Sequence, residues 1–173
     1  MFLKISGAVA IIFASYICGL YMANRSTFRN QDLEQMKKAL TIFKGEILYS
    51  ATPLENIFFE ISNRTIGIIS LLFETVAKNI ENHSKYGISE IWDTSILEIA
   101  NNSYFDGDDM EYIYSFGRTL GFADKNQQVN NAVLLIEYID SAQKGLREKK
   151  VSEEKLYKTL GITCGLMLVI VLF

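Results

Sequence analysis

The chain carries an apolar run at each end, and these two runs restrict its fold more than any other feature of the sequence. No charged residue occurs from Ile5 to Ala23, a stretch of nineteen positions. A helix of this length is about 28 Å long, which is close to the thickness of the hydrocarbon core of a bilayer. The sequence therefore predicts an N-terminal transmembrane helix within residues 1–23.

The second apolar run occupies residues 159–173. A helix of this length is only about 22 Å long, so Leu156 and Tyr157 must extend it while the Lys158 ammonium reaches back to the headgroups. We predict a C-terminal transmembrane helix at this end of the chain. Residues 24–158 then form one domain between the two transmembrane helices.

The basic residues next to the apolar runs predict the orientation of the chain in the membrane. Arg25 and Arg29 follow the first run. Six basic residues precede the second run and none follows it: Lys144, Arg147, Lys149, Lys150, Lys155 and Lys158. Because basic segments stay on the cytoplasmic side, we expect a protein of the cell membrane with two spans, a cytoplasmic domain and both termini outside.

A cleaved secretory signal is the alternative interpretation of the first run. The bulky residues Leu20 and Tyr21 argue against it, because a signal peptidase site before or after Ala23 requires small side chains. Cleavage would also leave the basic segment before the second run on the wrong side of the membrane. We therefore favour a retained span.

Small residues recur four positions apart in both apolar runs. They are Ser15 and Gly19 in the first run and Gly161 and Gly165 in the second. This spacing lets helix backbones approach closely. Close packing holds helices together in lipid, because the hydrophobic effect does not favour their association there. We predict that these residues pack either between the two spans of one chain or between copies of the chain, the second arrangement being self-association.

The domain between the apolar runs reads as helical throughout. Its single proline is Pro53. Apolar residues recur at spacings of three and four, as in Leu33, Met36 and Leu40, and no run alternates as a strand would. Trp92 is expected to anchor the core. The sequence thus predicts an all-α fold, a cytoplasmic antiparallel bundle of about six helices flanked by two transmembrane helices.

Capping residues predict where several of these helices begin. Thr52 is expected to cap the second helix, with Pro53 at its first position and Glu55 completing a capping box. The first and sixth helices are expected to continue into the apolar runs, so that the sixth is about 50 residues long. Further expected caps are Asn63 for the third helix, Asp106 for the fifth and Asp124 for the sixth.

The chain lacks the residues that most catalytic and metal sites require. One histidine and two cysteines are too few for a four-ligand zinc site or a disulfide framework. A calcium loop starting at Asp106 fails, because Glu111 stands where glycine is needed and Gly117 where glutamate is needed. No phosphate-binding lysine loop, GxSxG, HExxH or dinucleotide-binding turn occurs. We predict no enzyme activity, no cofactor and no metal, and the net charge of −3 argues against nucleic acid.

Acidic residues are concentrated in the middle of the chain. Residues 46–111 hold twelve acidic side chains and three basic ones. Because complementary charge orients a partner and speeds its association, this segment predicts a docking face for a basic cytoplasmic partner. A solvated surface without a partner is the alternative. The candidate docking residues are Asp106, Asp108, Asp109 and Glu111.

Five segments carry a likeness to a known family through their order and spacing. They are residues 46–54, Trp92, residues 120–124, the Gln127-Gln128 pair and residues 155–161. Together they resemble the stage III sporulation protein AB family over essentially the whole chain. The resemblance implies a soluble part similar to the cytoplasmic helical domain of type II secretion platform proteins, the F component.

The resemblance also implies a function and partners. It implies a noncatalytic component of the secretion-like channel complex that joins mother cell and forespore, in the mother-cell membrane around the forespore. The implied partners are a cytoplasmic ATPase, stage III sporulation protein AA, and the other membrane proteins of the complex. Platform proteins have two such domains and three spans, so a chain with one domain and two spans would need self-association or another partner. A membrane-anchored adaptor or signalling domain unrelated to secretion is the alternative function.

Overall fold

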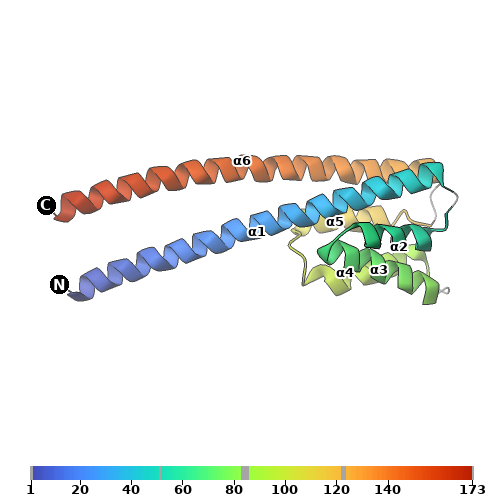
Figure 1. Cartoon of the computed structure of the whole chain (residues 1–173), viewed down its shortest axis with the longest axis horizontal. Coiled ribbons are helices and arrows are strands. Elements are labelled where there is room, and N and C mark those ends of the chain that lie inside the picture. Colours follow the sequence, from blue (N-terminus) through green and yellow to red (C-terminus); the bar gives the residue numbers. More distant parts are fainter. Residues whose placement is uncertain (1, 51, 83–85, 122–123, 173) are drawn as a thin grey trace.

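The structure is built from six α-helices. A computed structural model describes residues 2–50, 52–82, 86–121 and 124–172, with side chains described between residues 25 and 149. The helices are α1 (Phe2–Tyr49), α2 (Leu54–Arg64), α3 (Gly67–Asn82), α4 (Ile88–Ala100), α5 (Gly107–Gly117) and α6 (Lys125–Leu172) (Figure 1). No strand occurs among the described residues. The predicted all-α fold with about six helices is confirmed.

The first and last helices are much longer than the others. Each contains 48 residues, and they run antiparallel side by side, so that both chain ends lie at the same end of the molecule (Figure 1). Their outer halves project beyond the four short helices, which cluster at the opposite end. The predicted continuation of the first and sixth helices towards the chain ends is confirmed. Both helices can run this far because no proline interrupts either of them.

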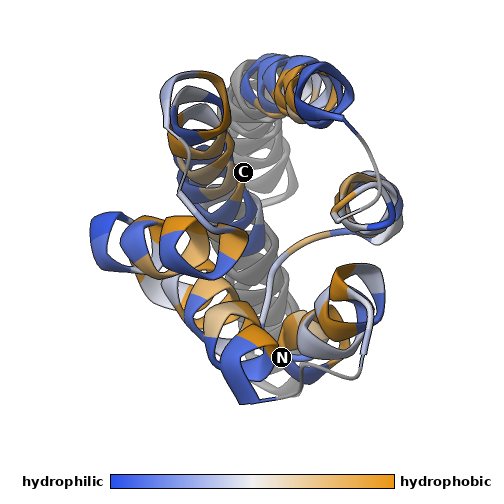
Figure 2. Cartoon of the chain, turned by 90° about the vertical axis from the view of Figure 1, so that its right-hand side faces the viewer, coloured by the Kyte–Doolittle hydropathy of each residue, from blue (hydrophilic) through white to orange (hydrophobic). Residues whose placement is uncertain are grey.

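The six helices form a closed ring around one core. Each helix packs against the next one in chain order, and α1 packs against α6, which closes the ring. The first helix also contacts α3. Figure 2 views the bundle along its long helices and shows the helices arranged around a common interior. The apolar stripe predicted for the first helix faces this interior, since Leu33, Met36 and Leu40 are at most 1% exposed.

Aromatic rings from five helices meet at the centre of the core. Phe43 of α1 contacts Phe58 of α2 and Phe116 of α5, with ring centroids 6.0 Å and 5.3 Å apart. Phe73 of α3 and Trp92 of α4 complete the cluster with centroids 5.5 Å apart. Such pairs add about 0.5–1.5 kcal/mol each beyond the burial of their area. The sixth helix contributes small and aliphatic side chains to the same core, namely Ala132, Leu135 and Ile139.

Trp92 joins α4 to α5 through both its ring and its polar group. The indole is fully buried, and its Nε1 donates a hydrogen bond to the carbonyl oxygen of Ile113 at 3.0 Å. The ring lies against Gly117, where an added Cβ would approach Trp92 Cδ1 to 1.8 Å. The prediction that Trp92 anchors the core is confirmed.

Two of the predicted helix starts are wrong. Pro53, rather than Thr52, is the N-cap of α2, and its carbonyl accepts the first helical hydrogen bonds. No side chain caps this helix end, because proline has no side-chain oxygen to accept from the free amides. Asn63 lies in the last turn of α2 and caps nothing. The third helix instead begins at Gly67, whose φ of +65° turns the chain between α2 and α3.

The predicted caps of the fifth and sixth helices are confirmed. The Asp106 side chain accepts a hydrogen bond from the Asp109 amide at 3.0 Å at the start of α5. The Asp124 carboxylate accepts one from the Gln127 amide at 2.8 Å at the start of α6. Both are short polar side chains that satisfy amides left free in the first turn of a helix.

The predicted membrane spans are not tested by the arrangement of the bundle. Within the described part of the chain, no helix combines the length and the apolar composition that crossing a bilayer requires. The spans predicted within residues 1–23 and 159–173 lie outside the residues whose side chains the structure describes. The same holds for their four predicted packing residues, Ser15, Gly19, Gly161 and Gly165.

Candidate functional site

The acidic segment singled out from the sequence forms the start of α5. Asp106 precedes the helix, and Asp109 occupies its third position, where its carboxylate accepts a hydrogen bond from the Asp106 amide at 2.9 Å. The two aspartates therefore cap each other reciprocally. This local arrangement turns the Asp109 side chain towards the interior, where it is 0% exposed.

A partly buried arginine forms ion pairs with both carboxylates. Arg29 of α1 donates from Nε to Asp109 Oδ2 at 2.7 Å and from Nη2 to Asp109 Oδ1 at 2.9 Å. The same Nη2 lies 2.7 Å from Asp106 Oδ2. The hydroxyl of Tyr138, on α6, donates to Asp109 Oδ1 at 2.8 Å. These four residues, which we call the Arg29 cluster, join α1, α5 and α6.

The Arg29 cluster holds its charged groups in their ionised forms. Burial favours a higher pKa for Asp109, but the hydrogen bonds from Arg29, the Asp106 amide and Tyr138 outweigh burial and keep this pKa below its ordinary value. The hydrogen bond to Asp109 raises the pKa of Arg29. Burial and the Asp109 carboxylate both raise the pKa of Tyr138. The cluster is therefore a structural ion pair.

This environment corrects part of the predicted docking site. Asp109 cannot reach a partner, because its carboxylate is buried and fully engaged within the Arg29 cluster. Asp106 is partly exposed but shares the charge of Arg29. The physical reason is a long-range ion pair with a residue 80 positions away, which the local sequence does not reveal.

The remaining docking candidates lie on the outer side of α5. Asp108 and Glu111 are exposed, and neither forms an ion pair with any residue whose side chain the structure describes. They line a hollow between α5 and α6 together with Tyr112, Ser115 and Tyr138. We call this surface the α5 groove. Docking through it is untested by the structure and stays a prediction.

An aromatic pair forms the floor of the α5 groove. The rings of Tyr112 and Tyr138 stack with centroids 3.9 Å apart, and Tyr112 is 45% exposed. Sequence reasoning missed Tyr112, although its spacing of four from Asp108 places it on the same helix face. The groove thus offers two carboxylates beside an exposed aromatic ring, a combination that suits an arginine or lysine side chain.

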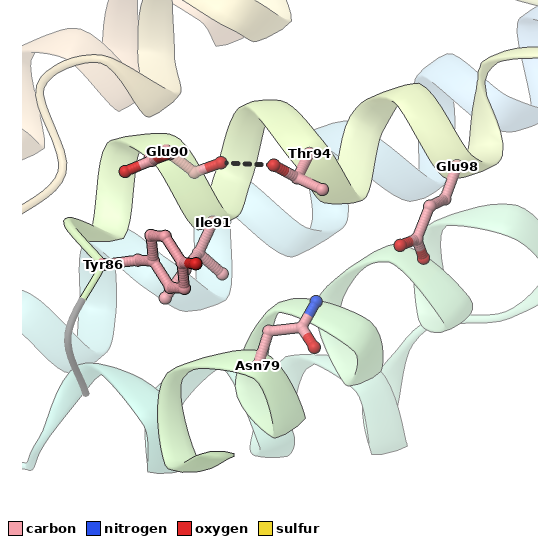
Figure 3. Close-up of a pocket in the computed structure, with 6 residues that line it drawn as sticks. All are labelled: Asn79, Tyr86, Glu90, Ile91, Thr94 and Glu98. Atoms are coloured by element: carbon pink, nitrogen blue, oxygen red, sulfur yellow. Dashed lines mark hydrogen bonds between the residues drawn. The ribbon is translucent and has the colours of Figure 1, made fainter. Parts of the chain in front are cut away.

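A second hollow lies between α3 and α4. Figure 3 shows its six lining residues, which are Asn79, Tyr86, Glu90, Ile91, Thr94 and Glu98. Thr94 Oγ1 donates to the Glu90 carbonyl at 2.9 Å, so this hydroxyl is engaged with its own helix. The six residues include no basic side chain that would hold an anion and no base positioned to activate a nucleophile. This hollow supports no catalytic assignment.

Metal ligands do not gather anywhere in the described part of the molecule. No group of three or more His, Cys, Asp or Glu residues with described side chains lies close enough to hold an ion. The acidic start of α5 contributes two of its carboxylates to Arg29 rather than to a metal.

Comparison with known proteins agrees with the resemblance in the sequence. A family model described as stage III sporulation protein AB matches residues 4–173. Stage III sporulation protein AB of Bacillus subtilis (strain 168) is 28% identical over 177 residues, which cover 98% of this chain and 99% of that protein.

The fold agrees as well. A solved structure of stage III sporulation protein AB has a TM-score of 0.67 and 20% sequence identity to this chain, covering 72% of this chain and 98% of the other. At that identity the likeness shows a shared helical fold. Because the family model matches nearly every residue, the chain belongs to the stage III sporulation protein AB family.

Proposed function

We propose that this chain is a noncatalytic platform component of the secretion-like channel complex between mother cell and forespore, required for endospore formation. The observation that carries the proposal is the pairing of α1 and α6. These helices bring both apolar chain ends to one end of the molecule and hold the helical domain at the other (Figure 1). Such an arrangement suits a membrane-anchored assembly domain.

The proposed location is the mother-cell membrane around the forespore. Residues 1–23 and 159–173 would span this membrane, with the bundle in the cytoplasm and both termini outside. The uncharged stretch within the first segment and the basic residues beside both segments support this placement.

The proposed cytoplasmic partner is the ATPase stage III sporulation protein AA, docked on the α5 groove. Asp108 and Glu111 are exposed there, beside the exposed Tyr112 ring, and form no ion pair with any described side chain. Basic side chains of a partner would gain both charge complementarity and contact with the ring. The other membrane proteins of the complex and further copies of this chain would complete the platform.

The docking proposal can be tested with two charge-reversal variants of the full chain. Asp108→Lys combined with Glu111→Lys is expected to weaken binding of the purified ATPase about tenfold or more, since opposed charges are replaced by like ones. Glu81→Lys combined with Glu98→Lys is the matched control, because these exposed residues of α3 and α4 lie outside the groove and change the net charge equally. Affinities would be measured by biolayer interferometry in detergent.

One outcome tests the docking site, and another tests the platform function. Equal loss of affinity in both variants would show that binding depends on net charge, and would contradict the α5 groove as the docking site. A wild-type chain that binds no ATPase and stays monomeric in detergent would contradict the platform proposal and favour an adaptor.

A further inference from the structure

The facing sides of α1 and α6 separate into a cleft at the point where the two helices leave the bundle. Inside the bundle they are tied together by Lys37 with Asp140, and by Gln143 Nε2, which lies 3.5 Å from the Asn30 carbonyl oxygen. Beyond this contact, towards the chain ends, the cleft is lined from both helices. Its residues are Ser26, Thr27, Asn30, Leu146 and Arg147, which we call the α1–α6 cleft.

Basic residues beside the cleft lack the ion pairs that two basic residues of α1 form deeper in the bundle. Arg29 and Lys37 each have a carboxylate partner on another helix. By contrast, Arg25, Lys144 and Arg147 are exposed and form no ion pair with any residue whose side chain the structure describes. The change from paired to unpaired cations occurs within about one helical turn.

The sequence around the cleft supplies little negative charge to balance these cations. Residues 141–149 contain one acidic side chain, Glu148, and residues 25–28 contain none. Arg147 lines the cleft, and Arg25 immediately precedes the lining residue Ser26 on α1, so the described side chains leave cationic charge here that an external anion could balance. Arg25 lies two residues after the end of the first apolar run, so the cleft faces the membrane surface if the proposed spans are correct.

We propose that the α1–α6 cleft binds the phosphate group of an anionic phospholipid, with Arg147 and Arg25 as its cationic ligands. This inference rests on the proposed membrane placement of the chain. A guanidinium binds two phosphate oxygens in parallel, and the Ser26 hydroxyl can donate a further hydrogen bond. Leu146 offers an apolar surface for the glycerol and first methylenes of the lipid. A free phosphate presents the same anionic group but lacks the apolar part.

Titrations with a phospholipid and with inorganic phosphate distinguish between these two ligands. The full chain, purified in a detergent with an uncharged headgroup, would be titrated with phosphatidylglycerol, phosphatidylcholine or inorganic phosphate while its melting temperature is followed. Phosphatidylglycerol is expected to raise Tm by about 3 °C at saturation, and the other two by much less. Equal shifts with phosphatidylcholine, or with inorganic phosphate alone, would overturn the proposal.

A matched pair of variants assigns the effect to the cleft. Arg25→Gln combined with Arg147→Gln is expected to weaken the apparent affinity for phosphatidylglycerol about 10- to 30-fold, since two cations near the headgroup are lost. Lys38→Gln combined with Arg118→Gln removes the same charge from exposed positions elsewhere on the bundle and should leave the affinity within about twofold. Equal weakening in both variants would overturn the assignment to the cleft.

Membrane insertion can be measured independently of the cleft. A chain that alkaline carbonate releases from cell membranes, yet binds phosphatidylglycerol selectively in detergent, would contradict the proposed spans and support the cleft. A chain that resists carbonate but shows no preference for phosphatidylglycerol would support the spans and overturn the cleft.

Discussion

Asp108 and Asp109 are neighbours in the first turn of α5, but their carboxylates have different environments. The Asp109 side chain accepts hydrogen bonds from Arg29, Tyr138 and the Asp106 amide. Asp108 is exposed and forms no ion pair among the described side chains. One carboxylate thus holds three helices together while its neighbour is free to meet a partner.

The variant Asp109→Asn is expected to lower the free energy of unfolding by about 3 kcal/mol. The reason is that Arg29, only 20% exposed, would lose its buried bidentate carboxylate partner and keep only the partly exposed Asp106. Asp108→Asn is the matched control and should have a much smaller effect. Urea unfolding can be followed by the fluorescence of Trp92, the single tryptophan of the chain. Equal destabilisation by both variants would contradict the structural role of the Arg29 cluster.

The difference in stability between wild type and Asp109→Asn should also depend on pH. Because Asp109 has a lowered pKa in the folded state, its ionised form contributes stability that is fully present above its ordinary pKa of about 4. This contribution is lost as the pH falls through the folded-state value. The stability difference between wild type and Asp109→Asn should therefore be constant near neutral pH and shrink below about pH 4. A difference that stays constant down to pH 3 would contradict this linkage.

Sequence reasoning finds the local contacts of these residues and misses the distant ones. Asp106 could be predicted as a cap, since a cap acts on amides two or three residues along the chain. The ion pair with Arg29 joins residues 80 positions apart and depends on the packing of α1 against α5 and α6, which periodicity does not specify. The docking prediction failed at Asp109 and stays open at Asp108 and Glu111 for this reason.

At the scale of whole helices, α4 and α5 meet through a glycine. The indole of Trp92 lies directly on Gly117 and also reaches the Ile113 carbonyl, so the two helices approach more closely than a side chain at residue 117 would permit. This contact ties α5, and with it the α5 groove, to the aromatic core.

Alanine substitutions at two helical glycines should have opposite signs. Gly117→Ala is expected to destabilise the bundle by about 3 kcal/mol, because its methyl group would overlap the Trp92 ring and force it to move. Gly145→Ala, within α6, meets nothing within 4 Å and should stabilise the chain by about 0.5–1 kcal/mol through higher helix propensity. Thermal unfolding followed by circular dichroism would measure both. Stabilisation by Gly117→Ala would contradict the close packing of Trp92.

Helix existence could be predicted from the sequence more reliably than helix starts. Buried apolar residues such as Leu33, Met36 and Leu40 repeat with the period of a helix, and single residues that depart from the pattern do not hide this repeat. A cap depends instead on the backbone conformation of one residue. Thr52 and Asn63 have suitable side chains, but the chain enters its helices at Pro53 and Gly67, so both predicted caps are wrong.

For the whole molecule, the closure of the ring by α1 and α6 determines where each surface faces. The four short helices pack onto one end of this pair, and the other end carries both apolar chain ends (Figure 1). A docking surface on α5 and a lipid-binding cleft between the long helices can therefore be used together, since they lie at different places along the same pair. Predicting this arrangement required the order of the helices around the core, which no single segment of the sequence encodes.

The proposed orientation of the chain in a membrane can be measured directly. In a variant without Cys18 and Cys164, Leu3→Cys reports on the N-terminal end and Asn126→Cys on an exposed position of the bundle. In growing cells made to express the chain in their cell membrane, with the bundle in the cytoplasm, a membrane-impermeant maleimide should label Leu3→Cys from outside and Asn126→Cys only after permeabilisation. Labelling of Asn126→Cys from outside intact cells would reverse the orientation. It would also place the α5 groove out of reach of any cytoplasmic ATPase.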